Sequence, residues 1–136
     1  MSTAVSMSTA VVTSAALTFC VLMTALIIFQ AALIAGAPLG RFAWGGQDRV
    51  LPVQKRLGSA TSIGLYLIFA VLVVERAGLA TVLGWPGFVA IAVWVLVGYF
   101  GLGIILNGLS RSRAERWTMA PLSAVLAVLT LVVALS

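Results

Sequence analysis

The side chains of this sequence that could do chemistry are few, and most of them are amides or carboxylates. Gln30 and Asn107 each lie near the end of a long apolar run. The carboxylates are those of Asp48, Glu75 and Glu115, each at or beyond the boundary of such a run. An unpaired buried carboxamide costs about 1–3 kcal/mol. We therefore expect both amides to face protein, either as ties between helices or as the floor of a polar binding site.

The loop between the first two apolar runs, residues 35–56, adds the other candidate binding groups. The two amides would lie at similar depth beneath it, so we expect at least one of them to contact this loop or the other amide. The candidate binding residues are Gln30, Trp44, Gly45, Gly46, Gln47, Asp48 and Asn107. The candidate contacts with anionic lipid headgroups are Arg41, Arg49, Lys55 and Arg56.

Patterns typical of catalysis, of cofactor binding or of a metal site are absent from the sequence. The chain has no His and one Cys, Cys20, so it cannot form an internal disulfide and is not expected to hold zinc, haem or an iron–sulfur cluster alone. It has no Walker loop and no dinucleotide fingerprint. Asp48 could act as an acid or base, but no partner is spaced to support it. We predict no enzyme, no catalytic or metal-binding residue and no cofactor.

The composition indicates a membrane protein. The 136 residues are 62% hydrophobic and 8% charged, whereas a soluble domain has about 45–50% apolar and about 25% charged residues. The long apolar runs predict one transmembrane domain over residues 1–136, an all-α four-helix bundle with up-down-up-down topology and a long structured first loop. The expected spans are residues 11–35, 57–74, 87–107 and 118–135.

Small residues recur at helical spacing on the third and fourth spans and predict close helix packing. Gly98 and Gly101 belong to a stripe on the third span, and Ala120, Ala124 and Ala127 share a face of the fourth. We therefore expect Gly98→Leu or Gly101→Leu to disrupt assembly more than Gly103→Leu.

The charges predict the orientation in the membrane. Residues 41–56 and 111–116 are basic, while the termini carry no charged side chain. The positive-inside rule then places both basic loops in the cytoplasm and both termini outside. The same rule explains the net charge of +5 better than nucleic-acid binding does. Arg occurs seven times and Lys once, a usage typical of high-GC bacteria, so we expect a bacterial inner membrane.

The first loop also carries a family resemblance. Its sequence AGAPLGRFAWGGQ, residues 35–47, followed by Val50-Leu51-Pro52, resembles the loop of a group of small four-span bacterial membrane proteins with no assigned activity. Their shared motif is A-G-x-P-x-G-x-x-A-W-G-G-Q, and the likeness extends to residues 107–116. The position of Asp48 is often His in that group, so no role of a titrating imidazole transfers to this chain. The resemblance implies an architecture and no chemistry.

Three functional hypotheses follow. The leading one is a non-enzymatic accessory or assembly subunit, or a homo-oligomer, with membrane lipid and other membrane proteins as partners. The second is an oligomeric small transporter or channel with a polar site near the cytoplasmic side. The third is a binder of lipid or of a lipid-linked substrate. A closed dry core would favour the first, a hydrated path the second, and a lateral groove holding lipid the third.

Overall fold

The computed structural model describes residues 8–136, and this part of the chain is helical with connecting loops and no strand. The four helices long and apolar enough to cross a membrane are α1 (Thr9–Ile34), α2 (Val53–Arg76), α3 (Pro86–Gly108) and α4 (Arg113–Leu135). Two short 3₁₀ turns, η1 (Gly40–Phe42) and η2 (Trp44–Gly46), lie in the first loop. The prediction of an all-α four-helix membrane bundle is confirmed. Residues 1–7, which the single-domain prediction includes, lie outside the described part.

All four helices begin earlier than expected, and α2 and α4 do so by about one turn. Helix α2 begins at Val53, directly after Pro52, whose φ of −67° and extended ψ suit the position before a helix. Helix α4 begins at Arg113, because the side chain of Ser112 accepts a hydrogen bond from the backbone N–H of Glu115 (3.3 Å). The first turns of both helices therefore contain basic residues that the sequence analysis placed in loops.

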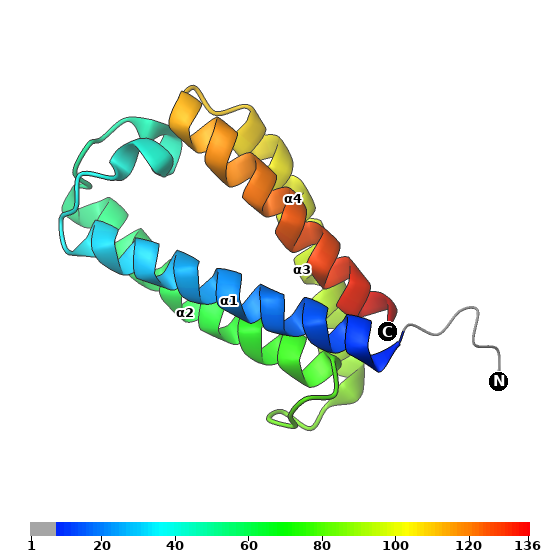
Figure 1. Ribbon diagram of the computed structural model, residues 1–136. Helices are drawn as coiled ribbons and strands as arrows, with labels where there is room; N and C mark the ends of the chain where they lie inside the picture. Colours follow the sequence, from blue (N-terminus) through cyan, green and yellow to red (C-terminus); the bar gives the residue numbers. More distant parts are fainter. Residues whose placement is uncertain (1–7) are drawn as a thin grey trace.

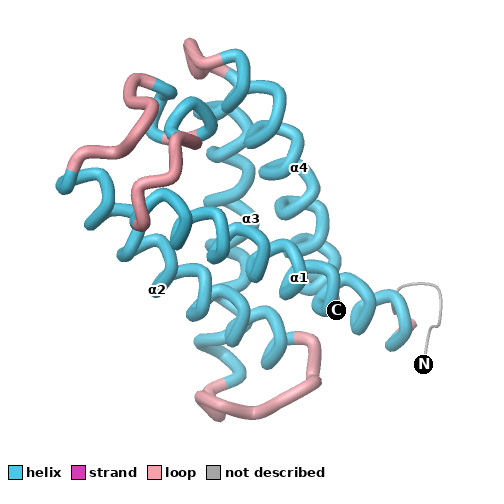
Figure 2. The backbone as a smooth tube through the Cα atoms, turned by 60° about the vertical axis from the view of Figure 1, so that its left-hand side comes forward, coloured by secondary structure: helices cyan, strands magenta, loops and turns pink. Residues whose placement is uncertain are grey.

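The helices are arranged as two antiparallel pairs. Helix α1 packs beside α2, and α3 packs beside α4. Figure 1 shows the two pairs meeting near the C terminus and diverging toward the first loop. Figure 2 shows the same arrangement from another side, with the first loop and the α3–α4 turn at one end of the bundle. The two basic loops thus lie together, at the end where the pairs are furthest apart.

Aromatic rings join the two pairs where they come together. The ring of Phe100 on α3 lies edge-on to Phe19 on α1 and to Phe69 on α2, with centroid distances of 5.9 Å and 6.0 Å. Such edge-to-face pairs add about 0.5–1.5 kcal/mol beyond the buried area. Val73 and Val133 are fully buried in the same core cluster. These side chains therefore form an apolar core that joins the two helix pairs.

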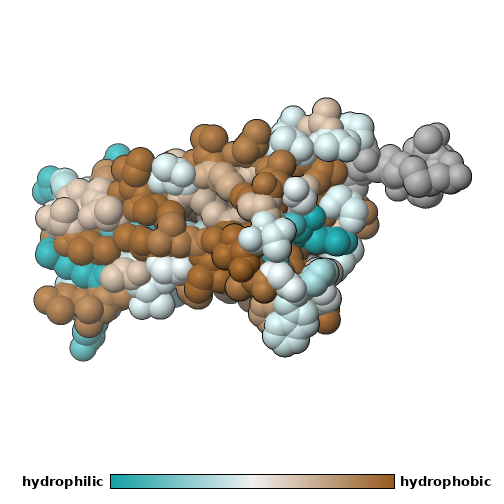
Figure 3. All heavy atoms as spheres, turned by 90° about the horizontal axis from the view of Figure 1, so that it is seen from below, coloured by the Kyte–Doolittle hydropathy of each residue, from teal (hydrophilic) through white to brown (hydrophobic). Residues whose placement is uncertain are grey.

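The outer surface of the bundle is apolar around its middle. Large hydrophobic side chains are exposed on all four helices, among them Val21, Ile68, Ile91 and Val128. Figure 3 shows brown, hydrophobic side chains across the middle of one face and teal ones toward its ends. Such a surface is stable in lipid, where apolar side chains need no burial inside the protein.

The predicted glycine stripe does not pack within the chain. A Cβ built on Gly98 or on Gly101 would meet no atom within 4 Å, whereas one built on Gly103 would lie 3.1 Å from the Ser123 hydroxyl. For contacts inside this chain the expected ranking of the three glycines is therefore wrong, because Gly103 is the one that faces α4. Packing of Gly98 and Gly101 against another chain stays a prediction. The three α4 alanines are each partly buried.

Candidate functional site

The first loop folds back on itself at Gly40. The backbone N–H of Gly40 donates to the carbonyl of Arg49 (2.9 Å). A Cβ built on Gly40 would lie 1.7 Å from the carbonyl oxygen of Asp48. Only glycine therefore allows the loop segments around residues 40 and 48 to come this close. Beneath this contact Leu33, Ala43 and Leu51 form a small buried cluster that anchors the loop to the end of α1.

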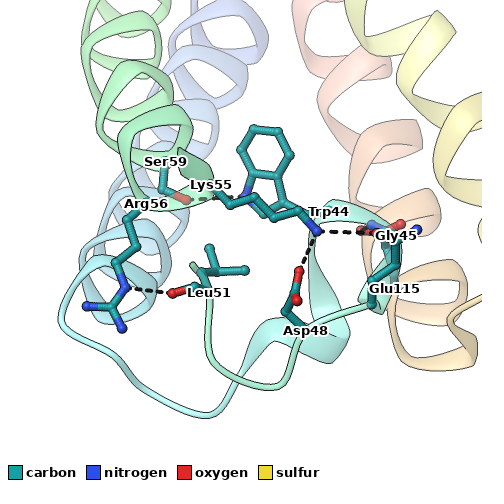
Figure 4. Close-up of polar contacts among 9 residues, drawn as sticks. Trp44, Gly45, Asp48, Leu51, Lys55, Arg56, Ser59 and Glu115 are labelled. Carbon is teal, nitrogen blue, oxygen red and sulfur yellow. Dashed lines mark hydrogen bonds and ion pairs between the residues drawn. The ribbon is translucent and has the colours of Figure 1, made fainter. Parts of the chain in front are cut away.

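Trp44 connects the loop to α2. Its backbone has a φ of +54°, in the left-handed region that residues other than glycine seldom adopt. The indole N–H donates to the Ser59 hydroxyl (3.3 Å), and the ring lies against Gly58, where an added Cβ would come within 2.5 Å of it. Figure 4 shows the side chain reaching from the loop to α2. The predicted membrane-interface anchor is thus also a contact within the protein.

The next residues connect the loop to α4. The backbone N–H of Gly45 donates to a carboxylate oxygen of Glu115 (3.3 Å), and the Ser112 hydroxyl donates to the carbonyl of Arg41. A Cβ built on Gly46 would lie 2.4 Å from that of Ser112. The loop therefore spans the distance between the two helix pairs and covers the space between them.

A cavity of about 430 Å³ lies in that space. Its floor includes Phe100, and part of its wall is formed by Phe42, Ala43 and Trp44 of the loop. All four helices contribute to it. The lining side chains with a polar atom, apart from Trp44, are Gln30 on α1, Ser62 and Tyr66 on α2, Tyr99 and Asn107 on α3, and Glu115 and Ser123 on α4.

Both predicted amides face protein and line this cavity. Gln30 is 8% exposed, and its carbonyl oxygen has no hydrogen-bond donor among the described residues, although Tyr66 lies on the same cavity wall. The Asn107 amide nitrogen donates to the Ser123 hydroxyl (3.1 Å), a tie between α3 and α4 of the kind the sequence analysis expected, with a partner that it did not name. In the described part of the chain no hydrogen bond joins either amide to the loop or to the other amide, although both line the same cavity as Phe42, Ala43 and Trp44.

Glu115 is the charged site residue that sequence reasoning missed, beside the uncharged Ser62, Tyr66, Tyr99 and Ser123. It was counted as a loop charge, but it lies in the first turn of α4, is 7% exposed, and lines the cavity. Among the described residues no cation lies within 4 Å of its carboxylate. The start of a helix favours a negative charge, and Ser112-Arg113-Ala114-Glu115 has the spacing of a capping box. That pattern could have located Glu115 in a helix, although not in a cavity.

The other predicted site residues lie outside the cavity lining. Lys55 pairs with Asp48 and also donates to the Gln47 side chain (3.4 Å), which ties the loop to α2. Gly45 and Gly46 contact the start of α4, as described above. The structure therefore brings Gln30, Trp44 and Asn107 to the cavity and leaves the remaining four in the outer part of the loop.

The four predicted headgroup cations separate into two kinds. Lys55 is paired, and Arg56 donates to the carbonyls of Leu51 (2.7 Å) and Ile34 (3.4 Å). Arg41, which lies over the Phe42 ring, and Arg49 are exposed. None of the four lines the cavity.

The cavity can therefore bind a molecule by hydrogen bonds to acceptor oxygens, by a negative charge at its rim and by contact with aromatic rings. Protein-family models, curated proteins and solved structures were compared with the chain, and none of them matches. The function is inferred from this geometry alone.

Proposed function

We propose that this multi-pass membrane protein binds a small amphipathic solute in the cavity under its first loop, as a small carrier does. The observation that supports this most is the pair of buried polar groups in the lining. Gln30 has an unpaired carbonyl oxygen, and Glu115 has no partner cation among the described residues. Leaving such groups buried costs free energy that a bound solute would recover.

The shape of the cavity supports a carrier rather than a channel. The cavity lies at the loop end, and the contacts of Phe100 with Phe19 and Phe69 close the bundle beneath it. A site covered by the loop at one end and closed by aromatic rings at the other forms no continuous path through the described residues, which suits a carrier better than a channel. The cavity lies between the loop and the apolar core around Phe100, so the bundle is not filled by apolar side chains along its whole length. The accessory and homo-oligomer hypotheses stay predictions. Gly98 and Gly101 of α3 have open space beside them in the described chain, so this face is available for packing against another protein.

Filling the cavity should abolish solute binding. Ser62 on α2 lines the cavity, and Thr61 beside it is exposed; each hydroxyl donates to a backbone carbonyl one turn earlier. The change Ser62→Phe should therefore occupy the site, while Thr61→Phe is a matched control on the outer face. In thermal unfolding of the protein in lipid nanodiscs, we expect an amphipathic solute that binds to raise Tm by about 3 °C in the wild type and in Thr61→Phe. It should leave Tm of Ser62→Phe unchanged.

A broad panel of small amphipathic solutes serves as the probe in this test. The proposed function is wrong if no solute stabilises the wild type, or if Ser62→Phe is stabilised as strongly as the control.

The proposal includes an orientation in a bacterial inner membrane, with both basic loops in the cytoplasm. The contact between Arg41 and Ser112 supports it, because the two basic loops then share one side. Both Gln47 and Ser136 are exposed, so a cysteine at either position can react from its own side of the membrane. In a Cys20→Ala background, we expect an impermeant thiol reagent to label Ser136→Cys in intact cells and not Gln47→Cys. Labelling of Gln47→Cys in intact cells, with Ser136→Cys protected, would reverse the orientation.

A further inference from the structure

We infer that the solute bound in this cavity is an organic cation, such as an amphipathic ammonium ion, with Glu115 as its counter-ion. The inference rests on the proposed function, because it names the chemical class that the same cavity would take. It follows from the charge, the hydrogen-bonding capacity and the aromatic content of the lining.

The cavity offers free acceptor oxygens from three side chains, beside donors such as the hydroxyls of Tyr66 and Tyr99. One carboxylate oxygen of Glu115 accepts from Gly45 and the other has no hydrogen bond to a described residue. The Gln30 carbonyl oxygen is buried and unpaired. One N–H of the Asn107 amide donates to Ser123, and its carbonyl oxygen has no hydrogen bond to a described residue. A bound molecule that donates hydrogen bonds or carries a positive charge would meet these needs.

Cations of the chain are kept away from the cavity. No Lys or Arg among the described residues lines it. Lys55 is paired with Asp48, and the neighbour of Glu115 in sequence, Arg116, donates to the carbonyl of Ser110 (3.3 Å). An anionic solute would therefore be repelled by the Glu115 charge with no Lys or Arg in the described lining to attract it, whereas a cation would pair with that charge.

Aromatic rings complete a cation site. Trp44, Tyr66 and Tyr99 contribute to the lining from the loop, α2 and α3. Their faces attract a cation within about 6 Å of the ring centre, and this attraction grows when water is excluded. A quaternary ammonium ion, which cannot donate a hydrogen bond, would use the rings and the carboxylate together.

The cavity is also open along α3, which suits a solute with an apolar part. Leu102 and Leu106 line it and are 54% and 61% exposed. A volume of about 430 Å³ lies within the usual range of small-molecule sites, about 300–1,000 Å³. An amphipathic cation could thus place its apolar part toward the lipid and its charged head toward Glu115.

Calorimetric titration of the full chain in nanodiscs tests the inference. The probes are benzyltrimethylammonium, its neutral isostere neopentylbenzene, and benzenesulfonate, each titrated also into empty nanodiscs. We expect the wild type to bind the cation and neither of the others with comparable affinity. Glu115→Gln, which keeps an acceptor for the Gly45 N–H, should weaken the binding of the cation at least about tenfold. Glu75→Gln, which removes an acid at the opposite end of the bundle and outside the cavity, should leave the cation affinity unchanged.

Tyr66 gives a second measurement that does not depend on the stability of the Glu115 variant. We expect Tyr66→Leu to weaken binding of the cation about threefold or more, and Tyr66→Phe to retain it, because the aromatic face is kept. Equal affinities of these two variants would overturn the inference.

The outcomes also separate this inference from the proposed function. If the neutral isostere binds as tightly as the cation, or if Glu115→Gln binds the cation like the wild type, the solute is not a cation. The inference is likewise overturned if the cation does not bind the wild type at all. In each case the proposed function still stands when another solute stabilises the wild type and Thr61→Phe but not Ser62→Phe. If no solute does so, both are wrong.

Discussion

Replacing Gly40 by Ala is expected to lower the free energy of unfolding by about 3 kcal/mol, because the added methyl group has no space. Its Cβ would lie 1.7 Å from the carbonyl oxygen of Asp48 and 2.9 Å from that of Arg49. Both atoms belong to the backbone, so no side-chain rotation can relieve the overlap. The hydrogen bond from the Gly40 N–H to Arg49 should be lost as well.

The measurement is thermal or denaturant unfolding in mild detergent, with Gly64→Ala as the matched control. Gly64 lies in α2, and a Cβ built on it meets no atom within 4 Å. The control should therefore be unchanged or more stable by about 0.5–1 kcal/mol, since Ala is the better helix former. Equal stability of the two variants would mean that the loop does not close at Gly40.

The same substitution should affect the cavity, because the loop forms part of its wall. If Gly40→Ala opens the loop, Trp44 loses its position on Gly58 and Ser59, and Gly45 loses its contact with Glu115. We expect the variant to lose the solute-dependent rise in Tm even where enough folded protein remains to measure it.

The number and type of the main elements could be predicted from the sequence. Four long apolar runs separated by short polar segments leave few other arrangements in a membrane, since backbone groups in lipid must pair within a helix. The helix starts were predicted less well, because Pro52 and Ser112 extend α2 and α4 into basic segments. Hydropathy alone does not detect such starts.

The candidate site could be predicted only in part. Gln30 and Asn107 were identified by their depth, and the loop by its composition, and all three contribute to the cavity. The contributions of Glu115 and Ser123 depend on how far the two helix pairs diverge, which is a property of the packed bundle. Periodicity shows that residues share a helix face but not which neighbour that face meets. For the same reason the glycine pattern of α3 did not identify the packing contact within the chain, since Gly103 and not Gly98 faces α4.

Replacing Arg56 by Met is expected to destabilise the protein by about 2 kcal/mol, although the sequence suggested a lipid contact at this position. The guanidinium donates to the carbonyl of Leu51, a residue that is only 1% exposed, and to that of Ile34 at the end of α1. Met retains much of the apolar stem of Arg but supplies no donor, so both carbonyls lose a partner. The positive charge also stabilises the C-terminal end of α1, and that contribution would be lost.

Arg49→Met is the matched control for Arg56→Met, because Arg49 is exposed and its side chain makes no hydrogen bond to a described residue. Its unfolding free energy should stay within about 0.5 kcal/mol of the wild type. If both arginines served mainly as headgroup contacts, the two variants would have equal stability and would lose affinity for anionic vesicles to the same extent. We expect the opposite pattern, with Arg56 required for the fold and Arg49 contributing only to the attraction of the loop to anionic lipid. Unfolding of both variants in detergent and their binding to vesicles of stated anionic content measure the two effects separately.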